Sequence, residues 1–319
     1  MPLRTAFTTL LDIEHPIALA PMGGSAGGLL AAAVSNAGGL GLIGVGSGDV
    51  RWMDREVALV AEGTSEPWGI GFQSWATDLA TVMRALEHQP SAVMLSFGDP
   101  ATLATVIRES DARLIIQVVD MTEASQALDV GADVIVAQGT EAGGHGGTRA
   151  TMPFVPAVVD LVHPTPVLAA GGIADGRGLA AVLSLGAAGA LVGTRFQASQ
   201  EALVDAEVVK AILDGHGEDT ERSRVLDIAR ESKWPPRYTG RTLRNDFLNQ
   251  WRNREVELEG NDEAIAAYHE AERRGDMSAV AVWASEAIDL ITESQSATEI
   301  VRGMVTDAEA TMRRLLALP

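Results

Sequence analysis

Seven residues, EAGGHGG at 141–147, bring together the residue types in this chain that could do chemistry. His145 stands between two Gly-Gly pairs and follows the apolar run 133–137. Glycine lacks a Cβ and accepts positive φ, so a glycine-rich turn lets the backbone come close to a ligand. An imidazole at that point suits proton transfer near neutral pH. We therefore predict that His145 is catalytic; the alternative is a surface loop with an incidental histidine.

Eight short apolar runs in the first 200 residues could position this turn, and helix-like stretches separate them. The runs are 17–20, 40–45, 68–72, 92–96, 113–119, 133–137, 166–170 and 189–193. Near-continuous apolar strands that alternate with helices indicate a parallel sheet covered on both faces. Eight such units predict a (β/α)8 TIM barrel, with an open doubly wound sheet as the alternative.

The carboxyl ends of the strands carry the chemistry in such a barrel. Here those ends are rich in glycines, amides and small residues. They include APMGG at 20–24, GFQ at 71–73, AQGTEAGGHGG at 137–147, AAGGI at 169–173 and GTRF at 193–196. A barrel that served only as a scaffold would not need this composition at so many strand ends.

The last two strand ends fit a phosphate site. Barrels commonly bind a phosphate after strands 7 and 8, through backbone amides and a helix N-terminus. We predict that four residues of these ends hold it: Gly171, Gly172, Gly193 and Thr194. The alternative is two ordinary tight turns. A Rossmann-type GxGxxG with an acidic partner is missing from the sequence, so a tightly bound nicotinamide is not indicated.

These motifs together resemble the nitronate monooxygenases, formerly called 2-nitropropane dioxygenases. The resemblance covers the whole barrel and extends more weakly into the C-terminal third. It implies non-covalent FMN, with its phosphate on the AGGI and GT turns and His145 facing the substrate. The implied cofactor contacts elsewhere are Met22, Gly23, Gln138, Gly143 and Gly144. Many members carry Asn after the third strand, where Gln73 offers the same amide on a longer side chain.

The resemblance implies FMN-dependent oxidation of alkyl nitronates, and of nitroalkanes in some members, by O2. His145 either removes a proton or only orients the nitronate, and the sequence leaves both roles open. The same GGH motif occurs in FMN-dependent NAD(P)H enoyl-acyl carrier protein reductases, which are the enzymatic alternative. A barrel that binds FMN or another phosphate ligand without turnover is the third interpretation.

Composition restricts the partners. The 319-residue chain has a net charge of −19 and no Cys, which disfavours nucleic acid and anionic lipid and excludes thiolate chemistry. Neither a signal segment nor an apolar span of membrane length is apparent, and no metal-ligand spacing occurs. We expect a cytoplasmic enzyme that meets a small-molecule substrate and O2, binds no metal, nucleic acid or membrane, and is compatible with homo-oligomerisation.

Charged residues become more frequent after residue 200, where the pattern indicates exposed amphipathic helices. We predict an FMN-binding barrel (1–213), a helical substrate subdomain over the barrel mouth (214–295) and a C-terminal helix that packs back (296–319).

Within the C-terminal part, the aromatic segment 233–251 could cover the flavin or merely connect the lid to the barrel. Helices are expected at 253–274, 278–292 and 297–316. Helical spacing of apolar residues predicts that Trp283 belongs to a core rather than to the ligand site.

Overall fold

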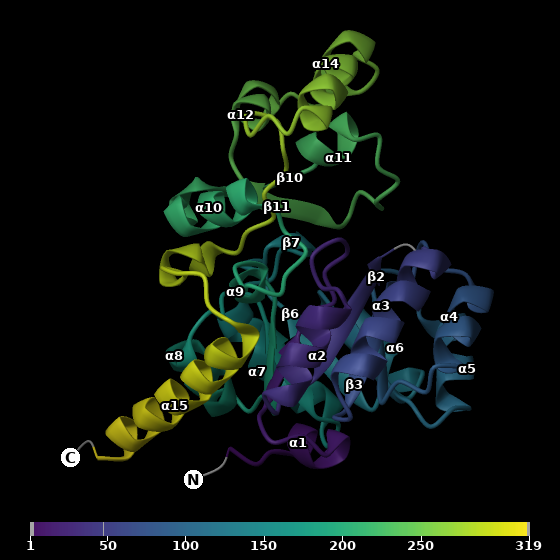
Figure 1. Cartoon of the computed structure of the whole chain (residues 1–319), viewed down its shortest axis with the longest axis vertical. Coiled ribbons are helices and arrows are strands. Elements are labelled where there is room, and N and C mark those ends of the chain that lie inside the picture. Colours follow the sequence, from purple (N-terminus) through teal and green to yellow (C-terminus); the bar gives the residue numbers. More distant parts are fainter. Residues whose placement is uncertain (1–2, 47, 318–319) are drawn as a thin grey trace.

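Eight parallel strands form a ring in the computed structural model, which describes residues 3–46 and 48–317 (Figure 1). The strands are β1 (Ile17–Leu19), β2 (Gly41–Gly46), β3 (Trp68–Gln73), β4 (Ala92–Ser96), β5 (Arg113–Val118), β6 (Val134–Gln138), β8 (Val167–Ala170) and β9 (Gly189–Val192). Their order around the ring is β1-β9-β8-β6-β5-β4-β3-β2, and a parallel bridge between Ala18 and Leu40 joins its two ends. The (β/α)8 barrel is therefore confirmed, and the open-sheet alternative is wrong.

Helices surround the ring on its outer side. They are α2 (Gly28–Asn36), α3 (Val50–Gly63), α4 (Leu79–Leu86), α5 (Ala101–Arg108), α6 (Met121–Asp129), α7 (Thr151–Val162), α8 (Gly176–Ser184) and α9 (Thr194–Gln197). Helix α10 (Ala206–Asp214) instead lies above the barrel (Figure 1), where Ile212 packs with Val282 and Ile288. Helix α1 (Ala6–Leu11) closes the amino-terminal end of the barrel, where Phe7 and Leu11 are buried in the interior cluster. The carboxyl-terminal end of the barrel is not closed by this helix.

Alternation along the strands separates the barrel interior from the layer beneath the helices. On β6, Val134 and Val136 belong to the interior cluster, whereas Ile135 and Ala137 pack under the helices. The next inward positions of neighbouring strands are polar. They are Gln73 on β3, Ser96 on β4, Gln117 on β5 and Gln138 on β6. A layer of amides and a hydroxyl therefore lies over the apolar interior at the carboxyl end of the barrel.

A second unit lies over the barrel mouth (Figure 1), and we call residues 217–295 the cap. Its elements are η1 (Gly217–Asp219), β10 (Thr220–Ser223), α11 (Val225–Ala229), β11 (Thr239–Leu243), α12 (Asp246–Trp251), α13 (Glu255–Leu258), α14 (Asp262–Arg273) and η2 (Glu286–Leu290). The cap contains a sheet as well as helices, because β10 and β11 pair antiparallel and β11 also pairs with β7 (Gly144–Gly146). The EAGGHGG segment is thus partly a strand shared by barrel and cap.

Two expected cap helices differ from the structure. The helix expected at 253–274 is broken into α13 and α14 at Gly260, whose φ is +79°. The helix expected at 278–292 is wrong, because only the short η2 forms there and Trp283 bridges to Thr242 of β11. Pairing with a strand distant in sequence outweighs the local helical spacing of the apolar residues.

The expected C-terminal helix is confirmed as α15 (Ala297–Leu316), which begins with a capping box of Ser296 and Glu299. It packs along α8 and α2 (Figure 1). Gly176 allows the close approach to α8, since a Cβ there would lie 2.4 Å from Met304 O. The division at 213/214 and 295/296 stays a prediction.

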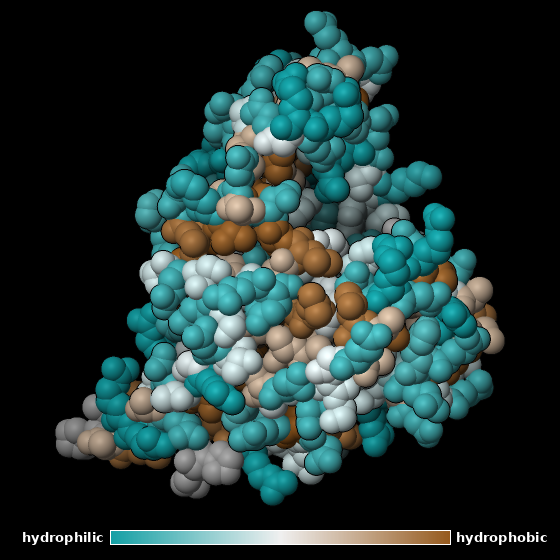
Figure 2. Space-filling view, viewed as in Figure 1, coloured by the Kyte–Doolittle hydropathy of each residue, from teal (hydrophilic) through white to brown (hydrophobic). Residues whose placement is uncertain are grey.

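Figure 2 shows mostly hydrophilic surface over the cap, with hydrophobic residues gathered where cap and barrel meet. Within residues 3–46 and 48–317, no helix is both long enough and apolar enough to cross a membrane.

Candidate active site

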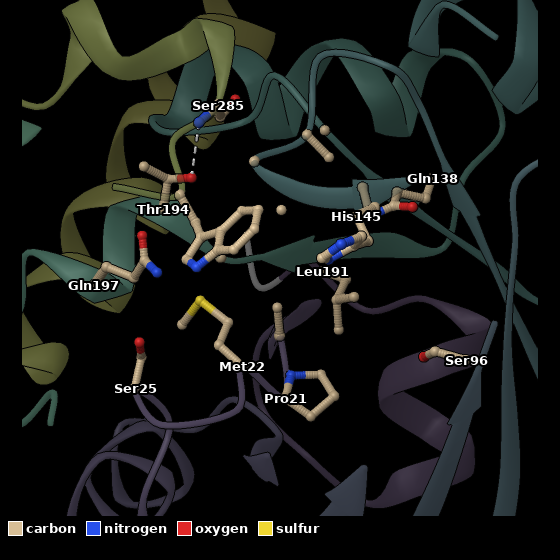
Figure 3. Close-up of a pocket in the computed structure, with 18 of the residues that line it drawn as sticks. Pro21, Met22, Ser25, Ser96, Gln138, His145, Leu191, Thr194, Gln197 and Ser285 are labelled. Atoms are coloured by element: carbon tan, nitrogen blue, oxygen red, sulfur yellow. Dashed lines mark hydrogen bonds between the residues drawn. The ribbon is translucent and has the colours of Figure 1, made fainter. Parts of the chain in front are cut away.

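A cavity of about 310 Å³ lies at the carboxyl end of the barrel and is lined by both barrel and cap (Figure 3). This volume is typical of small-molecule sites. Every site residue predicted from the sequence lines it. These residues are Met22, Gly23, Gln73, Gln138, Gly143, Gly144, His145, Gly171, Gly172, Gly193 and Thr194. The structure therefore brings together residues that lie up to 172 positions apart in the chain.

Two residues restrain the imidazole ring of His145, one through a ring nitrogen and one through the ring face. Its Nε2 lies 2.9 and 3.0 Å from the two carboxylate oxygens of Asp227 on α11. Its ring stacks on Trp234 with centroids 3.6 Å apart and planes 5° from parallel, while the Trp283 ring lies 5.1 Å away. Trp283 thus lines the cavity, and its expected role as a core residue is wrong.

The backbone of His145 is fixed by the barrel. Gln138, at the end of β6, donates from Nε2 to the His145 carbonyl at 3.0 Å. Its Oε1 is buried and has no hydrogen-bond partner within the described chain. Gln138 therefore joins the polar layer of the barrel to the strand that carries His145.

Arg222 on β10 forms hydrogen bonds with the backbone of the turn that precedes His145. Its guanidinium donates hydrogen bonds to the backbone carbonyls of Thr140, Ala142, Gly144 and Thr239. Burial, followed by the positive charge of nearby Arg241, lowers the pKa of Arg222 to about 10. Arg222 stays protonated at neutral pH, so all these carbonyls keep a charged donor.

Arg241 on β11 supports the same segment from the neighbouring strand. Its Nε donates to Thr140 O at 2.9 Å, its Nη1 to Thr220 Oγ1 at 3.0 Å, and its Nη2 pairs with Glu286 at 2.7 Å. The two arginines together bind the turn after β6 to the cap sheet.

The ends of β8 and β9 supply an open, glycine-lined wall. Gly172 has φ of +74°, and a Cβ there would meet only the Glu141 side chain, at 3.4 Å and beyond. A Cβ on Gly193 would likewise meet no atom closer than 3.5 Å. Thr194 Oγ1 accepts from Ser285 N of the cap at 3.1 Å (Figure 3) and keeps its own proton to donate. This wall can therefore take up a ligand group through backbone and a hydroxyl.

Other predicted glycines serve packing. A Cβ on Gly143 would come 2.7 Å from the backbone of Ala284, so glycine there lets the turn after β6 meet the cap. Gly171, with φ of +100°, has Gly139 O only 2.9 Å from the position of a Cβ.

Trp234 belongs to a segment that is bound to the barrel rim by ring contacts and hydrogen bonds. Its ring also contacts Phe97, with centroids 5.0 Å apart. Tyr238, four residues on, donates to Glu123 Oε1 at 2.7 Å and accepts from Gly98 N at 2.9 Å. Burial and then the Glu123 hydrogen bond raise the pKa of Tyr238. Segment 233–251 does cover the cavity, through Trp234.

The residues predicted for the site did not include Asp227, Arg222 or Gln117. Asp227 lies 82 positions from His145, and no motif or spacing links the two. Gln117 has a buried Nε2 without a hydrogen-bond partner in the described residues, and the alternation of β5 could have signalled its inward position. The described chain also contains no group of three His, Asp or Glu side chains that could hold a metal.

Comparisons with known proteins agree with this arrangement. The family model for nitronate monooxygenase matches residues 4–81 and 71–307. The chain is 36% identical to nitronate monooxygenase npaC of Metarhizium robertsii, over 93% of this chain and 92% of that protein. FabK from Thermotoga maritima superposes with a TM-score of 0.87 at 30% identity, covering 98% of both chains. Nitroalkane oxidase from Streptomyces ansochromogenes superposes with a TM-score of 0.82 at 25% identity, covering 98% of this chain and 100% of that one. The chain therefore belongs to the nitronate monooxygenase family of oxidoreductases.

Proposed function

We propose that this protein oxidises alkyl nitronates, and the nitroalkanes from which they form, with O2 and non-covalently bound FMN. The observation that carries this proposal is the position of His145, an imidazole on the wall of the same cavity that Gly172 and Gly193 line. Membership of the nitronate monooxygenase family supports the reaction type. FMN when bound supplies the redox chemistry, taking electrons from the nitronate and passing them on to O2.

Features of the cavity fit FMN. Gly172 and Gly193 leave open space where a Cβ would stand, which suits a phosphate approached by backbone amides. Gln117 Nε2, Gln138 Oε1 and Gln197 Oε1 are buried cavity-wall atoms that lack a protein partner among the described residues. A flavin ring presents both donors and acceptors, so it can satisfy such amides. Met22 and Gly23 would contact the same group from the turn after β1.

The protein contributes binding and proton transfer. His145 accepts the α-proton of a neutral nitroalkane, which leaves the substrate as a nitronate. With a preformed nitronate, His145 has no C–H proton to remove and serves to orient the nitro oxygens. Trp234 and Trp283 form apolar walls for the alkyl group, and Arg230 on the cavity wall provides positive potential for the anion.

The test compares two substrate forms. We expect His145→Asn to keep FMN and to lose about 10²–10⁴-fold in turnover of a neutral nitroalkane, as for loss of a general base. With the preformed nitronate the loss should be much smaller. His88→Asn is the matched control, because His88 also pairs with a carboxylate, Asp54, but lies outside the cavity. Equal losses on both substrates would assign His145 an orienting role, and no loss on either would refute the proposal.

The match to FabK over almost its full length keeps an FMN-dependent NAD(P)H enoyl-acyl carrier protein reductase as the second candidate. A paired assay separates the two reactions. One arm measures O2 uptake with a nitronate and no pyridine nucleotide; the other measures anaerobic NAD(P)H oxidation with an enoyl thioester. Activity only in the second arm would replace the first proposal. A yellow protein inactive in both arms would point to a barrel that binds FMN without turnover.

A further inference from the structure

We propose that Asp227 is a positioning residue that fixes the tautomer of His145 and makes Nδ1 the nitrogen that exchanges a proton with substrate. The kinetic part of this inference rests on the proposed function, whereas its spectroscopic part does not.

The contact between the two side chains determines which ring nitrogen of His145 carries the proton. Both carboxylate oxygens of Asp227 lie within 3.0 Å of His145 Nε2, and both side chains are only 8% exposed. An ionised carboxylate can only accept hydrogen bonds. Nε2 must therefore carry a proton, and in a neutral imidazole the lone pair is then on Nδ1.

The surroundings of the ring leave Nδ1 free for substrate. The Nε2 edge faces the cap sheet, since a Cβ on Gly240 of β11 would lie 3.6 Å from Nε2. Nδ1 has no hydrogen-bond partner within the described residues. It is also not among the buried unpaired atoms of those residues, so it is accessible, and His145 lines the cavity. Figure 3 shows the His145 ring turned into the cavity from the side of Gln138.

Asp227 is itself held rigidly. It lies on α11, whose neighbouring residues Val225, Leu226 and Ala229 are buried in the cap core. Its backbone carbonyl accepts from Ser232 N at 2.8 Å. Within the described chain His145 is the hydrogen-bond donor to its carboxylate. Burying a carboxylate that has a single hydrogen-bond donor lowers the stability of the fold. Here that one hydrogen bond fixes the tautomer of the imidazole.

The Trp234 stack completes the alignment. Asp227 restrains the ring edge and Trp234 restrains the ring plane, 5° from parallel. A flip of the imidazole about the Cβ–Cγ bond would move Nε2 away from Asp227 and requires breaking both contacts. The structure thus presents one defined proton acceptor to the cavity rather than two interchangeable ones.

Asp227→Asn tests the inference with little change in shape. The Asn amide can donate to Nε2 and so transfer the ring proton to Nδ1, where it blocks proton abstraction. We expect turnover of a neutral nitroalkane to fall by about 10²–10⁴-fold, as for a general base in the wrong tautomer. Oxidation of a preformed nitronate should fall much less. Asp227→Glu keeps a carboxylate and should restore part of the nitroalkane activity.

The tautomer is read directly in the full-length protein, as purified, labelled with 15N-histidine. Long-range 1H–15N spectra at pH 8 distinguish Nε2–H from Nδ1–H, and His145→Asn identifies the His145 signals among the six histidines. We expect Nε2–H in the wild type and in Asp227→Glu, and a shift toward Nδ1–H in Asp227→Asn. Asp54→Asn is the matched control, because Asp54 pairs with Nε2 of His88 at 3.1 Å outside the cavity. It should leave His145 unchanged.

Several outcomes would overturn the inference. They are an Nδ1–H or doubly protonated His145 in the wild type, an unchanged tautomer in Asp227→Asn, and equal kinetic losses on both substrates. If neither substrate is oxidised, the proposed function fails, and the spectra alone then decide this inference. If Asp227→Asn does not fold, the wild-type and Asp227→Glu spectra still decide it.

Discussion

The barrel rim and the cap line the same cavity with different kinds of chemical group. The rim contributes glycines, amides and hydroxyls at strand ends, and its wall at Gly172 and Gly193 consists of backbone. The cap contributes charged and aromatic side chains, including Arg230 and Trp234, and its Asp227 contacts His145. Under the proposed function, the rim would hold the cofactor, whereas the cap would orient the imidazole and contact the substrate.

Local structure explains this difference. Parallel strands end at one edge of the barrel, so their backbone amides converge there without help from side chains. The cap has no such convergence and places its groups through a small sheet and buried arginines. His145 lies between the two, on β7, which follows a barrel strand and pairs with a cap strand.

The largest effect is expected from Gly172→Val, which tests whether the barrel rim binds the cofactor. A β-branched residue is strained at φ of +74°, and its Cβ would enter the open wall. This strain, about 1–3 kcal/mol, is present with and without FMN and lowers stability, whereas the added side chain occupies the space proposed for the phosphate. FMN affinity, measured by flavin fluorescence titration, should therefore fall by roughly tenfold or more, which corresponds to about 1.4 kcal/mol. Gly260→Val is the matched control, since Gly260 has φ of +79° but lies in the cap outside the cavity. It should lower stability and leave FMN affinity intact; the same FMN affinity in both variants would contradict a rim-held cofactor.

Arg241→Met addresses the attachment of the two regions. It removes a buried guanidinium from Thr140 O and Thr220 Oγ1 and leaves those acceptors unsatisfied. We expect the free energy of unfolding to fall by about 1–3 kcal/mol, measured by urea denaturation. Arg244→Met breaks a partly exposed ion pair with Asp219 just beyond the same strand and should cost about 0–1 kcal/mol. Equal effects would mean that Arg241 does not fasten the turn after β6.

Trp234→Ala should give a smaller effect, confined to the cap side. An aromatic stack is worth about 0.5–1.5 kcal/mol beyond its buried area, so kcat/KM for a nitroalkane should fall about 2- to 12-fold. FMN content should not change, because Trp234 belongs to the cap. Trp234→Phe keeps a stacking ring and should recover most of the activity. Loss of FMN in Trp234→Ala would show that the cap also holds the cofactor.

The barrel was largely predictable from the sequence for a physical reason. Its strands are buried on both faces and therefore appear as continuous apolar runs, and each one is followed by a local helix. The glycines and amides at strand ends lie in fixed relation to those runs. All the residues predicted for the site consequently line one cavity, although their roles toward FMN stay predictions.

The cap was predicted less well because its structure depends on contacts distant in sequence. Residues 278–292 have helical spacing, yet Trp283 pairs beside β11. The Asp227–His145 pair joins two segments 82 positions apart, and the sequence near Asp227 contains no feature that distinguishes it from other acidic residues of the cap.

The connection between β10 and β11, residues 224–238, has a consequence for how such proteins diversify. Both of its ends are fixed by paired strands, while between them it places Arg230 and Trp234 at the cavity and Asp227 against His145. Loops anchored on a rigid scaffold tolerate insertion and exchange. Changes in this one segment can therefore alter the groups proposed to face the substrate, while the strand ends of the barrel keep the glycines and amides proposed to bind FMN.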